Sequence, residues 1–494
     1  MSLSLPASTL LNTRTFTLKL ALAIVLLPVR ALPAQARFDW ASLAMKDIEG
    51  IHETLRDNHP GAVDPERLHF RDWLTRGRAA SLIRAQSARS AAEYTRALRY
   101  YVNGFRDGHI GLTFNNPASM AWPGFLTRTT DDGRTTVTVR TGGTDPALGA
   151  ELLSCDGIPS RTLVERFVTP YRTNADIPHE AAARSVFLFA TYADDPQAPR
   201  RCVIREGTIQ RTVDLQWRPF LATVRNDLLA AASGSLSPEL GIRTVGAVTF
   251  ISLPSFNWWG DGADRFRAFL TTLRERRDVL LTSKNIVLDV RGNQGGNSSW
   301  GAQVLAQLWG EPPVRAIASS FDWTVDWRAS SGNAAAMRAA AASSRQAGLS
   351  GDATYRSGIA DSMDAAVRDH RPYVRAAQPP RPLNADSVGR TPFAHTVFLL
   401  TDHSCASACL DFMDIAIRLP GTVHVGLPTS GDAVYIDNTG LTLPSGLASL
   451  SYSLKVYRNR VRGNNVWYTP QRLWPGGQMS DTAVAAWIAT LDQR

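Results

Sequence analysis

Lysine is scarce in this sequence. Only four of its 53 basic residues are lysines, Lys19, Lys46, Lys284 and Lys455, so the net charge of +9 rests almost entirely on arginine. The basic residues are scattered, with no dense Lys/Arg run and no zinc-finger spacing. Nucleic-acid binding requires a clustered basic patch. We therefore expect a solvated basic surface and no nucleic-acid partner.

Long apolar runs are also missing, apart from one near the N-terminus. A positively charged segment precedes the apolar stretch Leu20–Val29, and Ala34–Ala36 forms a small-x-small cleavage site. No other run approaches the ~18 apolar residues of a membrane span. Residues 1–36 are therefore predicted to be a signal peptide. The mature chain is expected to be exported, periplasmic or secreted, without stable membrane insertion. Arg30 keeps an uncleaved anchor open as the alternative.

Cysteine is limited to four residues, all beyond the leader. No set of four Cys and His residues has metal-ligand spacing, so we expect no zinc site and no cofactor. An even number of cysteines in an exported chain permits disulfides. Four cysteines allow three pairings. We predict that Cys405 pairs with Cys409, and Cys155 with Cys202.

Residues 37–115, at the start of the mature chain, are predicted to form helices. Apolar residues recur at helical spacing on one face: Tyr94, Ala97, Leu98, Tyr101, Val102 and Phe105. Gly108 is predicted to break this helix immediately before His109.

Strands are predicted over residues 120–219, where "TTVTVR" and "RTVDLQW" alternate in polarity. Residues 221–494 then read as buried strands separated by helices, which indicates an α/β core. An Ala/Ser/Arg-rich stretch at 316–394 is long for a connection, so we interpret it as an insertion that is partly helical or mobile.

Ser407 is the first candidate for chemistry. It lies in "TDHSCASACLDFMD", between a buried strand and an apolar helix, flanked by Ala406 and Ala408. Small neighbours allow a sharp turn, and a helix N-terminus favours developing negative charge. The competing interpretation is a simple helix cap, for which Ser404 is the better candidate.

A serine nucleophile needs a base. Lysines are few, so histidine is the more plausible partner. His109 stands out because it sits in a glycine-flanked loop, and His403 is the second choice.

The segment "LDVRGNQGG" could provide an oxyanion hole. A buried strand ends here in Asp289, and Gly295 and Gly296 follow closely. Glycines let backbone N–H groups approach a ligand. An ordinary strand-to-loop turn is the alternative.

Taken in order, four segments resemble the C-terminal (tail-specific) processing peptidases, a serine peptidase family with a tricorn-type branch. They are "RDGHIGLTF", "GAELLSCDGIPS", "NIVLDVRGNQGG" and "LLTDHSCASACLDF" with the following "VHVGLPTSGD". The resemblance implies a ClpP/crotonase-like α/β catalytic core, an N-terminal helical segment and a small β-rich PDZ-like module. It also implies that Ser407 is the nucleophile.

Within that family, the sequence is more similar to the tricorn-like Ser/His branch than to the Ser/Lys branch. The position of the Ser/Lys lysine is held by Asp432, whereas His109 matches the histidine of the other branch. That branch also has a glutamate near the C-terminus, where this chain has Asn464 or Asn465. An asparagine could orient the imidazole by accepting from its N–H.

The resulting hypothesis is an exported serine peptidase that acts on peptides or unfolded proteins, with cleavage near their C-termini as one option. Backbone N–H groups of Gly295, Gly296 or Ala408 would hold the oxyanion, and no metal or cofactor is needed. The β-rich module would bind a peptide end by strand addition. One alternative is a catalytically impaired peptide- or ligand-binding protein on the same fold. Another is an acyl-group enzyme acting on small thioesters.

Overall fold

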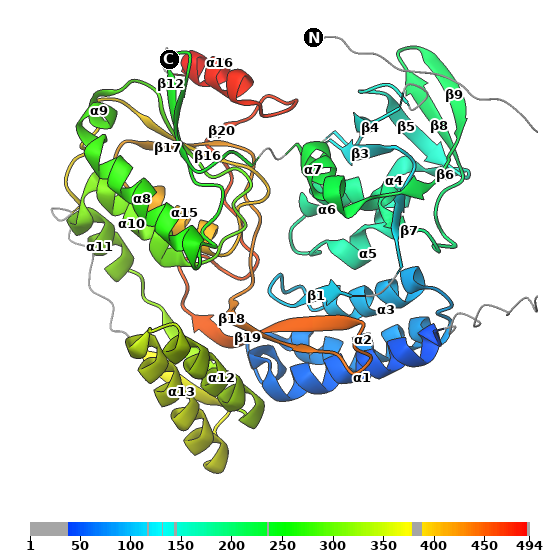
Figure 1. Cartoon of the computed structure of the whole chain (residues 1–494), viewed down its shortest axis with the longest axis horizontal. Helices are drawn as coiled ribbons and strands as arrows, with labels where there is room; N and C mark the ends of the chain where they lie inside the picture. Colours follow the sequence, from blue (N-terminus) through cyan, green and yellow to red (C-terminus); the bar gives the residue numbers. More distant parts are fainter. Residues whose placement is uncertain are drawn as a thin grey trace, which may run out of the picture. The chain divides into compact units, whose positions relative to one another are not determined.

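The computed structural model describes residues 38–115, 118–130, 132–142, 146–234, 237–377 and 388–491. The predicted signal peptide at 1–36 lies outside these residues. Helices and several sheets alternate along the chain, which confirms the predicted mixed α/β class (Figure 1). No helix in the described part of the chain has the length and apolar character needed to cross a bilayer.

The N-terminal layer is helical, as its apolar spacing predicts. It contains α1 (Trp40–Asn58), the short 3-10 turn η1 (Pro60–Ala62), α2 (Leu68–Gln86) and α3 (Ala91–Asn103). The predicted stripe on α3 is buried between these helices. However, α3 ends earlier than expected, because Gly104 rather than Gly108 is its C-cap. The residues between Gly104 and β1 are therefore a loop, and this loop carries His109.

A five-stranded sheet packs against the N-terminal helices. Its path is β1 (Gly111–Phe114), β19 (Ala448–Arg458), β14 (Thr324–Arg328) and β15 (Tyr373–Ala377), with β18 (Tyr435–Thr442) paired to β19. Apolar side chains from the sheet and from α1 to α3 share one core. In Figure 1 the long strands β18 and β19 lie beside the blue N-terminal helices.

The stretch predicted as an insertion, 316–394, contributes to this sheet. Its strands β14 and β15 pair with each other, and β14 also pairs with β19. Between them, α12 (Ser331–Gln346) and α13 (Ser350–Arg368) form a helical hairpin. The expectation of partial helicity is met, but the strands tie the segment into the fold because β14 is hydrogen-bonded on both edges.

The β-rich stretch folds around a six-stranded antiparallel sheet. Its strands are β3 (Phe125–Thr129), β4 (Thr135–Arg140), β5 (Glu151–Cys155), β6 (Ile158–Pro159), β8 (Arg201–Glu206) and β9 (Ile209–Asp214). Its helices are α4 (Ser160–Phe167), α5 (Thr169–Arg172), α6 (Glu180–Arg184), η2 (Ser185–Phe189) and α7 (Ala222–Ser233). A small sheet of β2 (Met120–Trp122), β7 (Thr191–Tyr192) and β10 (Arg218–Pro219) adjoins it. The predicted disulfide joins Cys155 of β5 to its register partner Cys202 of β8.

The second half of the chain is built on a mainly parallel sheet. Its order is β11 (Gly241–Val245), β12 (Val248–Ser252), β13 (Ile286–Asp289), β16 (Val397–Thr401), β17 (Thr422–Gly426) and β20 (Arg472–Leu473). The helices packed with it are α8 (Asp261–Glu275), α9 (Arg277–Thr282), α10 (Ser298–Trp309), α11 (Glu311–Ser319), α15 (Ala408–Ala416) and α16 (Asp481–Leu491).

Parallel pairing runs continuously from β12 through β13 and β16 to β17. Residues of β13 and β16 are buried throughout, as the continuous apolar runs predict. Parallel strands end at the same edge of a sheet, so the loops after β13 and β16 meet there. These are the loops that carry Gly295, Gly296 and Ser407.

Candidate active site

Ser407 occupies a sharp turn between β16 and α15. Its backbone has φ 54° and ψ −123°, a conformation that is costly for a residue with a Cβ. Ser407 itself, and not Ser404, is at the N-cap of α15. Within the described residues, its side chain accepts no capping hydrogen bond from that helix. The turn therefore leaves the hydroxyl for other partners.

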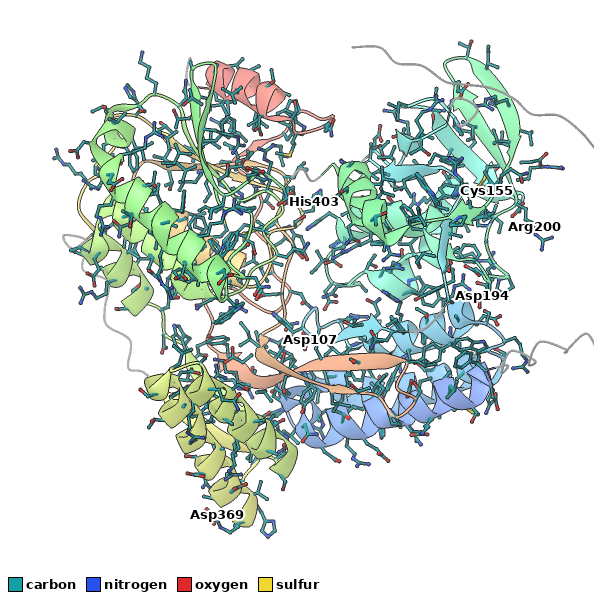
Figure 2. The ribbon with its side chains drawn as sticks, in the orientation of Figure 1. Asp107, Cys155, Asp194, Arg200, Asp369 and His403 are labelled. Atoms are coloured by element: carbon teal, nitrogen blue, oxygen red, sulfur yellow. A yellow bond between two sulfur atoms is a disulfide. The ribbon has the colours of Figure 1, made fainter. Side chains whose placement is uncertain are left out.

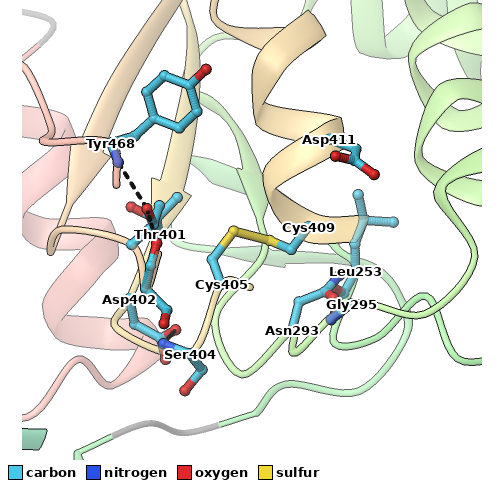
Figure 3. The surroundings of a disulfide bond; sticks show 12 residues. Leu253, Asn293, Gly295, Thr401, Asp402, Ser404, Cys405, Cys409, Asp411 and Tyr468 are labelled. Atoms are coloured by element: carbon cyan, nitrogen blue, oxygen red, sulfur yellow. Dashed lines mark hydrogen bonds between the residues drawn. A yellow bond between two sulfur atoms is a disulfide. The ribbon is translucent and has the colours of Figure 1, made fainter. Parts of the chain in front are cut away.

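The predicted disulfide between Cys405 and Cys409 spans this turn (Figure 3). Both cysteines are fully buried. The turn is also tied to the loop after β13, because Ala406 donates its N–H to the carbonyl of Asn293. Asn293 in turn donates from Nδ2 to the carbonyl of Leu253, at 2.8 Å. The turn at Ser407 is thus held by the disulfide and by the hydrogen bond between Ala406 and Asn293.

His109 lies against Ser407, although 298 positions separate them in the sequence. Its Nε2 is 3.3 Å from the Ser407 Oγ. The imidazole is mostly buried, with 12% of its side chain exposed. The backbone carbonyl of His109 accepts a hydrogen bond from Asn438 Nδ2, at 3.0 Å, which anchors the loop to β18. The structure thereby brings together the predicted nucleophile and the predicted base.

Asp107 supports this histidine, and the sequence analysis did not identify it. Figure 2 labels Asp107 in the same loop. One carboxylate oxygen, Oδ1, accepts the backbone N–H of His109 at 2.9 Å. The other, Oδ2, lies 3.1 Å from Nε2 of His59. Both side chains of the His59–Asp107 pair are almost completely buried.

The hydrogen bonds of His59 show which of its ring nitrogens carries the proton. The N–H of Gly61 donates to His59 Nδ1, so that nitrogen is an acceptor and the proton of a neutral ring is on Nε2. Burial lowers the pKa of His59, although the neighbouring Asp107 acts in the opposite direction. A neutral His59 therefore donates from Nε2 to Asp107, which accepts as a carboxylate.

The second ring nitrogen of His109 faces that carboxylate at longer range. Nδ1 lies 3.8 Å from Asp107 Oδ1. It is buried and has no hydrogen-bond partner among the described residues. This distance is longer than a hydrogen bond, and catalytic hydrogen bonds are often long before a substrate binds.

Asn464 and Asn465 do not lie where they could orient the His109 imidazole, although the sequence predicted that role. Asn464 Oδ1 accepts the N–H of Val434, and Asn465 Nδ2 donates to the carbonyl of Arg106 and to Asp176. Neither is hydrogen-bonded to the His109 ring in the described structure. The predicted orienting hydrogen bond is therefore absent there. Asn465 instead holds the backbone of the histidine loop, through Arg106.

The predicted oxyanion donors divide into used and unused groups. Gly295 N–H already donates to Asn293 Oδ1, at 2.9 Å, so this donor is occupied. Within the described residues, Gly296 N–H and Ala408 N–H have no acceptor. A Cβ on Gly295 would lie 2.8 Å from the Ser407 Cβ and 2.9 Å from the Ala408 nitrogen. Glycine at 295, at φ +98°, is thus what allows the two loops to approach.

The other candidates for a base point elsewhere. His403 donates from Nδ1 to the carbonyl of Pro428 and stacks on His179, with ring centroids 4.9 Å apart. Asp432, at the position of the Ser/Lys lysine, is buried and accepts from Arg460 and Arg462. The residue that the structure places against Ser407 is His109.

These groups form an arrangement suited to acyl transfer. A hydroxyl, an imidazole and a carboxylate follow one another, and the N–H of Ala408, the residue after Ser407, has no acceptor among the described residues. Asp107 and His59 were missed because neither follows a strand or a glycine pair. The signal available was the spacing of Asp107, two residues before His109, which lets one carboxylate reach both the backbone and the ring.

Comparison with known proteins bears on the fold. No protein-family model matches the sequence, and no curated protein matches it significantly. The crystal structure of mature CPAF superposes with a TM-score of 0.60 and 14% identity, covering 92% of this chain and 97% of CPAF. For mature CPAF complexed with lactacystin the TM-score is 0.60 and the sequence identity 14%, covering 92% of this chain and 98% of CPAF. For the photosystem II D1 C-terminal processing protease the TM-score is 0.33 and the sequence identity 12%, covering 89% of this chain and 93% of that protease. The chain therefore shares the fold of CPAF over most of its length.

Proposed function

We propose that this protein is an exported serine peptidase of the tail-specific processing type, with a Ser/His mechanism. The observation that carries the proposal is the 3.3 Å contact between His109 Nε2 and Ser407 Oγ. The N–H groups of Ala408, which follows Ser407, and of Gly296 have no acceptor among the described residues. The shared fold with CPAF is consistent with the proposal.

The chemistry follows from these positions. His109 Nε2 takes the proton of Ser407 as Oγ attacks a peptide carbonyl. The resulting oxyanion is held by the N–H groups of Gly296 and Ala408, a contribution of ~3–4 kcal/mol in comparable sites. His109 then protonates the leaving amine, and the C–N bond breaks to give an acyl-enzyme. A water, deprotonated by His109, hydrolyses the ester and returns the hydroxyl to Ser407.

Asp107 takes the role that the sequence analysis gave to the asparagines. When His109 becomes an imidazolium, its Nδ1–H faces the carboxylate of Asp107 at 3.8 Å. A negative charge there stabilises the cation, which a neutral asparagine amide does not do. His59 keeps this carboxylate in place by donating from Nε2.

The proposed substrates are peptides or unfolded proteins, taken in an extended form. An edge strand of the β-rich module would pair with the peptide backbone. Export is supported by the leader-like N-terminal sequence and by the disulfides between Cys155 and Cys202 and between Cys405 and Cys409, since disulfides persist in oxidising compartments.

A fluorophosphonate serine probe tests the proposal directly. We expect covalent labelling of Ser407, mapped by mass spectrometry, and no labelling of Ser407→Ala. His109→Ala should abolish labelling while the protein remains folded by circular dichroism. Cleavage of an unfolded protein substrate should disappear in both variants. Cleavage that persists in Ser407→Ala would contradict the assignment.

A peptide-binding protein without catalysis is the second candidate. It is favoured by the unpaired Nδ1 of His109 and by the absence of glutamate after Glu311. Stoichiometric peptide binding by folded protein, with no labelling of Ser407 and no turnover, would support this alternative.

A further inference from the structure

A cavity of ≈260 Å³ lies next to the histidine loop, between α3, α5 and η2. Asp107 and Gly108, which immediately precede His109, form part of its wall. The cavity is also strongly basic. It is lined by Arg99 of α3, Arg172 of α5 and Arg184 of α6. We refer to this space as the arginine cavity.

Among the residues that the structure describes, the three arginines have no protein counter-ion. In the described part of the chain, none of Arg99, Arg172 and Arg184 forms an ion pair or a hydrogen bond, and Arg99 Nε is buried without an acceptor. Two of them lie over aromatic rings instead. The Arg172 guanidinium is 3.9 Å from the ring centroid of Phe187, and that of Arg99 is 5.1 Å from Phe114.

The remaining charges on the cavity wall are already used. Arg106 pairs with Asp176 at 2.8 Å. Glu180 accepts from the N–H of Asn174 and from the hydroxyl of Ser430. Asp107 accepts from His59 and from the backbone of His109. These carboxylates are held by other donors and do not reach the three arginines.

Such a cluster is unfavourable without an anion. Burial lowers the pKa of Arg172 well below its usual value, and the positive charges of Arg99 and Arg184 add to this effect. Buried charges are normally paired, because removal from water is costly. A planar carboxylate matches the fork of a guanidinium and forms charge-assisted hydrogen bonds.

We propose that the arginine cavity is a subsite for a carboxylate of the peptide substrate, held by Arg99, Arg172 and Arg184. The inference rests on the proposed function, since the cavity and the reacting groups share the loop that contains His109. The carboxylate can come from an Asp or Glu side chain or from the C-terminus of the peptide, and the experiment separates these sources.

The first experiment compares quenched fluorescent peptides of one neutral sequence. One form ends in an amide, one in a free carboxylate, and a series places Glu or Gln at each successive position. We expect the wild-type kcat/KM to be at least about tenfold higher for a form that carries the matching carboxylate. A preference for the free terminus identifies the C-terminal carboxylate as the ligand, and a preference for Glu at one position identifies a side chain.

Arg184→Gln and Arg172→Gln should remove this preference while the neutral peptide is cleaved as before. Arg184 is exposed, so its variant is expected to fold. The matched control is Arg161→Gln in α4, an 84% exposed arginine paired with Glu165, which should keep the preference. Equal cleavage of neutral and anionic peptides by the wild type, or an unchanged preference in Arg184→Gln and Arg172→Gln, would overturn the proposal.

Binding to the Ser407→Ala protein separates this inference from the proposed function. Fluorescence anisotropy with the same labelled peptides should show carboxylate-dependent binding that weakens at least about tenfold in Ser407→Ala/Arg184→Gln. If the wild type cleaves nothing but binding keeps this dependence, the peptidase assignment fails and the subsite stands. If cleavage occurs and neither assay depends on the carboxylate, the subsite fails alone.

Discussion

The conformation of Ser407 connects the backbone to the chemistry. A residue at φ 54° and ψ −123° is held there by its surroundings, here the disulfide, the short Ala406 and Ala408 neighbours and the adjoining glycine loop. The hydroxyl consequently points toward His109 and not back onto its own helix. In the proposed function, this backbone conformation keeps the Ser407 hydroxyl available as a nucleophile and prevents it from capping the helix.

Asp107 gives the first prediction at this scale. Asp107→Asn keeps the size of the side chain but removes the negative charge facing His109 Nδ1. We expect kcat to fall by roughly 100- to 10,000-fold with little change in KM, because the imidazolium loses its counter-charge. Steady-state kinetics on a quenched peptide measure this.

The matched control for that variant is Asp176→Asn, which alters a carboxylate that touches Arg106 and Asn465 at the same loop but does not face the ring. It should change kcat by less than about tenfold. Similar effects of the two variants would mean that Asp107 merely supports the loop.

Gly295 gives the second prediction. In Gly295→Ala the new methyl group would meet the Ser407 Cβ at 2.8 Å and the Ala408 nitrogen at 2.9 Å, so the oxyanion donor is displaced. We expect at least a roughly 100-fold loss of kcat, as when one donor is removed. Gly149→Ala is the control: it has the same kind of positive φ, +80°, but open space around the Cβ. It should lower stability slightly and leave kcat unchanged.

Sequence alone located some of these residues and not others. Ser407 and the glycine pair follow buried strands, so their place at one sheet edge could be anticipated. For Asp107 the available sequence signal was its spacing, two residues before His109. Its contact with His59, which lies 48 positions earlier, forms only after α1 and α3 pack. For Asn465, spacing indicated the right neighbourhood, but its amide is directed at the carbonyl of Arg106 and not at the ring.

At the scale of elements, the two disulfides have different roles. The bond between Cys155 and Cys202 closes a long loop, with a sequence separation of 47, whereas that between Cys405 and Cys409 closes a separation of 4. Loop-closure entropy then predicts that replacing the first pair by alanine costs about 4 kcal/mol of unfolding free energy, and the second about 2 kcal/mol.

The third prediction is that loss of the short disulfide, Cys405–Cys409, reduces activity more than loss of the long one, Cys155–Cys202. The Cys405→Ala/Cys409→Ala protein should be labelled by the fluorophosphonate probe at least about tenfold more slowly, because the turn at Ser407 is less constrained. The Cys155→Ala/Cys202→Ala protein, assayed where it is folded, should be labelled at the wild-type rate. Urea unfolding and labelling kinetics on both proteins test this, and equal labelling rates would show that the short disulfide does not maintain the site.

The stretch at 316–394 shows why elements were harder to predict than site residues. Strand β14 is short, and its partner β19 lies far along the chain: Arg458, whose side chain donates to Asp326, comes 132 positions later. Strand β14 is stabilised by its pairing with β19, and the local amino-acid composition does not predict a pairing with so distant a segment. The hairpin of α12 and α13 was partly visible, because alanine favours helices.

For the whole molecule, buried histidines predict how stability depends on pH. Burial lowers the pKa of His424 from 6.5 to about 4. Below pH 6.5 the unfolded chain binds a proton that the native protein excludes, so the free energy of unfolding falls as the pH is lowered. This one residue accounts for about 2 kcal/mol lost between pH 7 and pH 5.

His424→Asn should therefore flatten the pH dependence over that interval, whatever its effect on stability at pH 7. The control is His370→Asn, at an exposed histidine with φ +57°, a conformation that asparagine tolerates. Urea unfolding at pH 7 and pH 5 gives the slopes. His59 also has a lowered pKa, so some dependence should remain in His424→Asn. Identical slopes in the wild type and His424→Asn would contradict the prediction.

The distance between His109 and Ser407 along the chain has a consequence for biosynthesis. The histidine loop is made early and the serine turn late, and the strand β1 that follows the histidine pairs with β19, which is made later still. A growing chain therefore lacks the complete set of groups that the proposed function requires. The proposed hydrolytic site would thus be complete only at the end of folding.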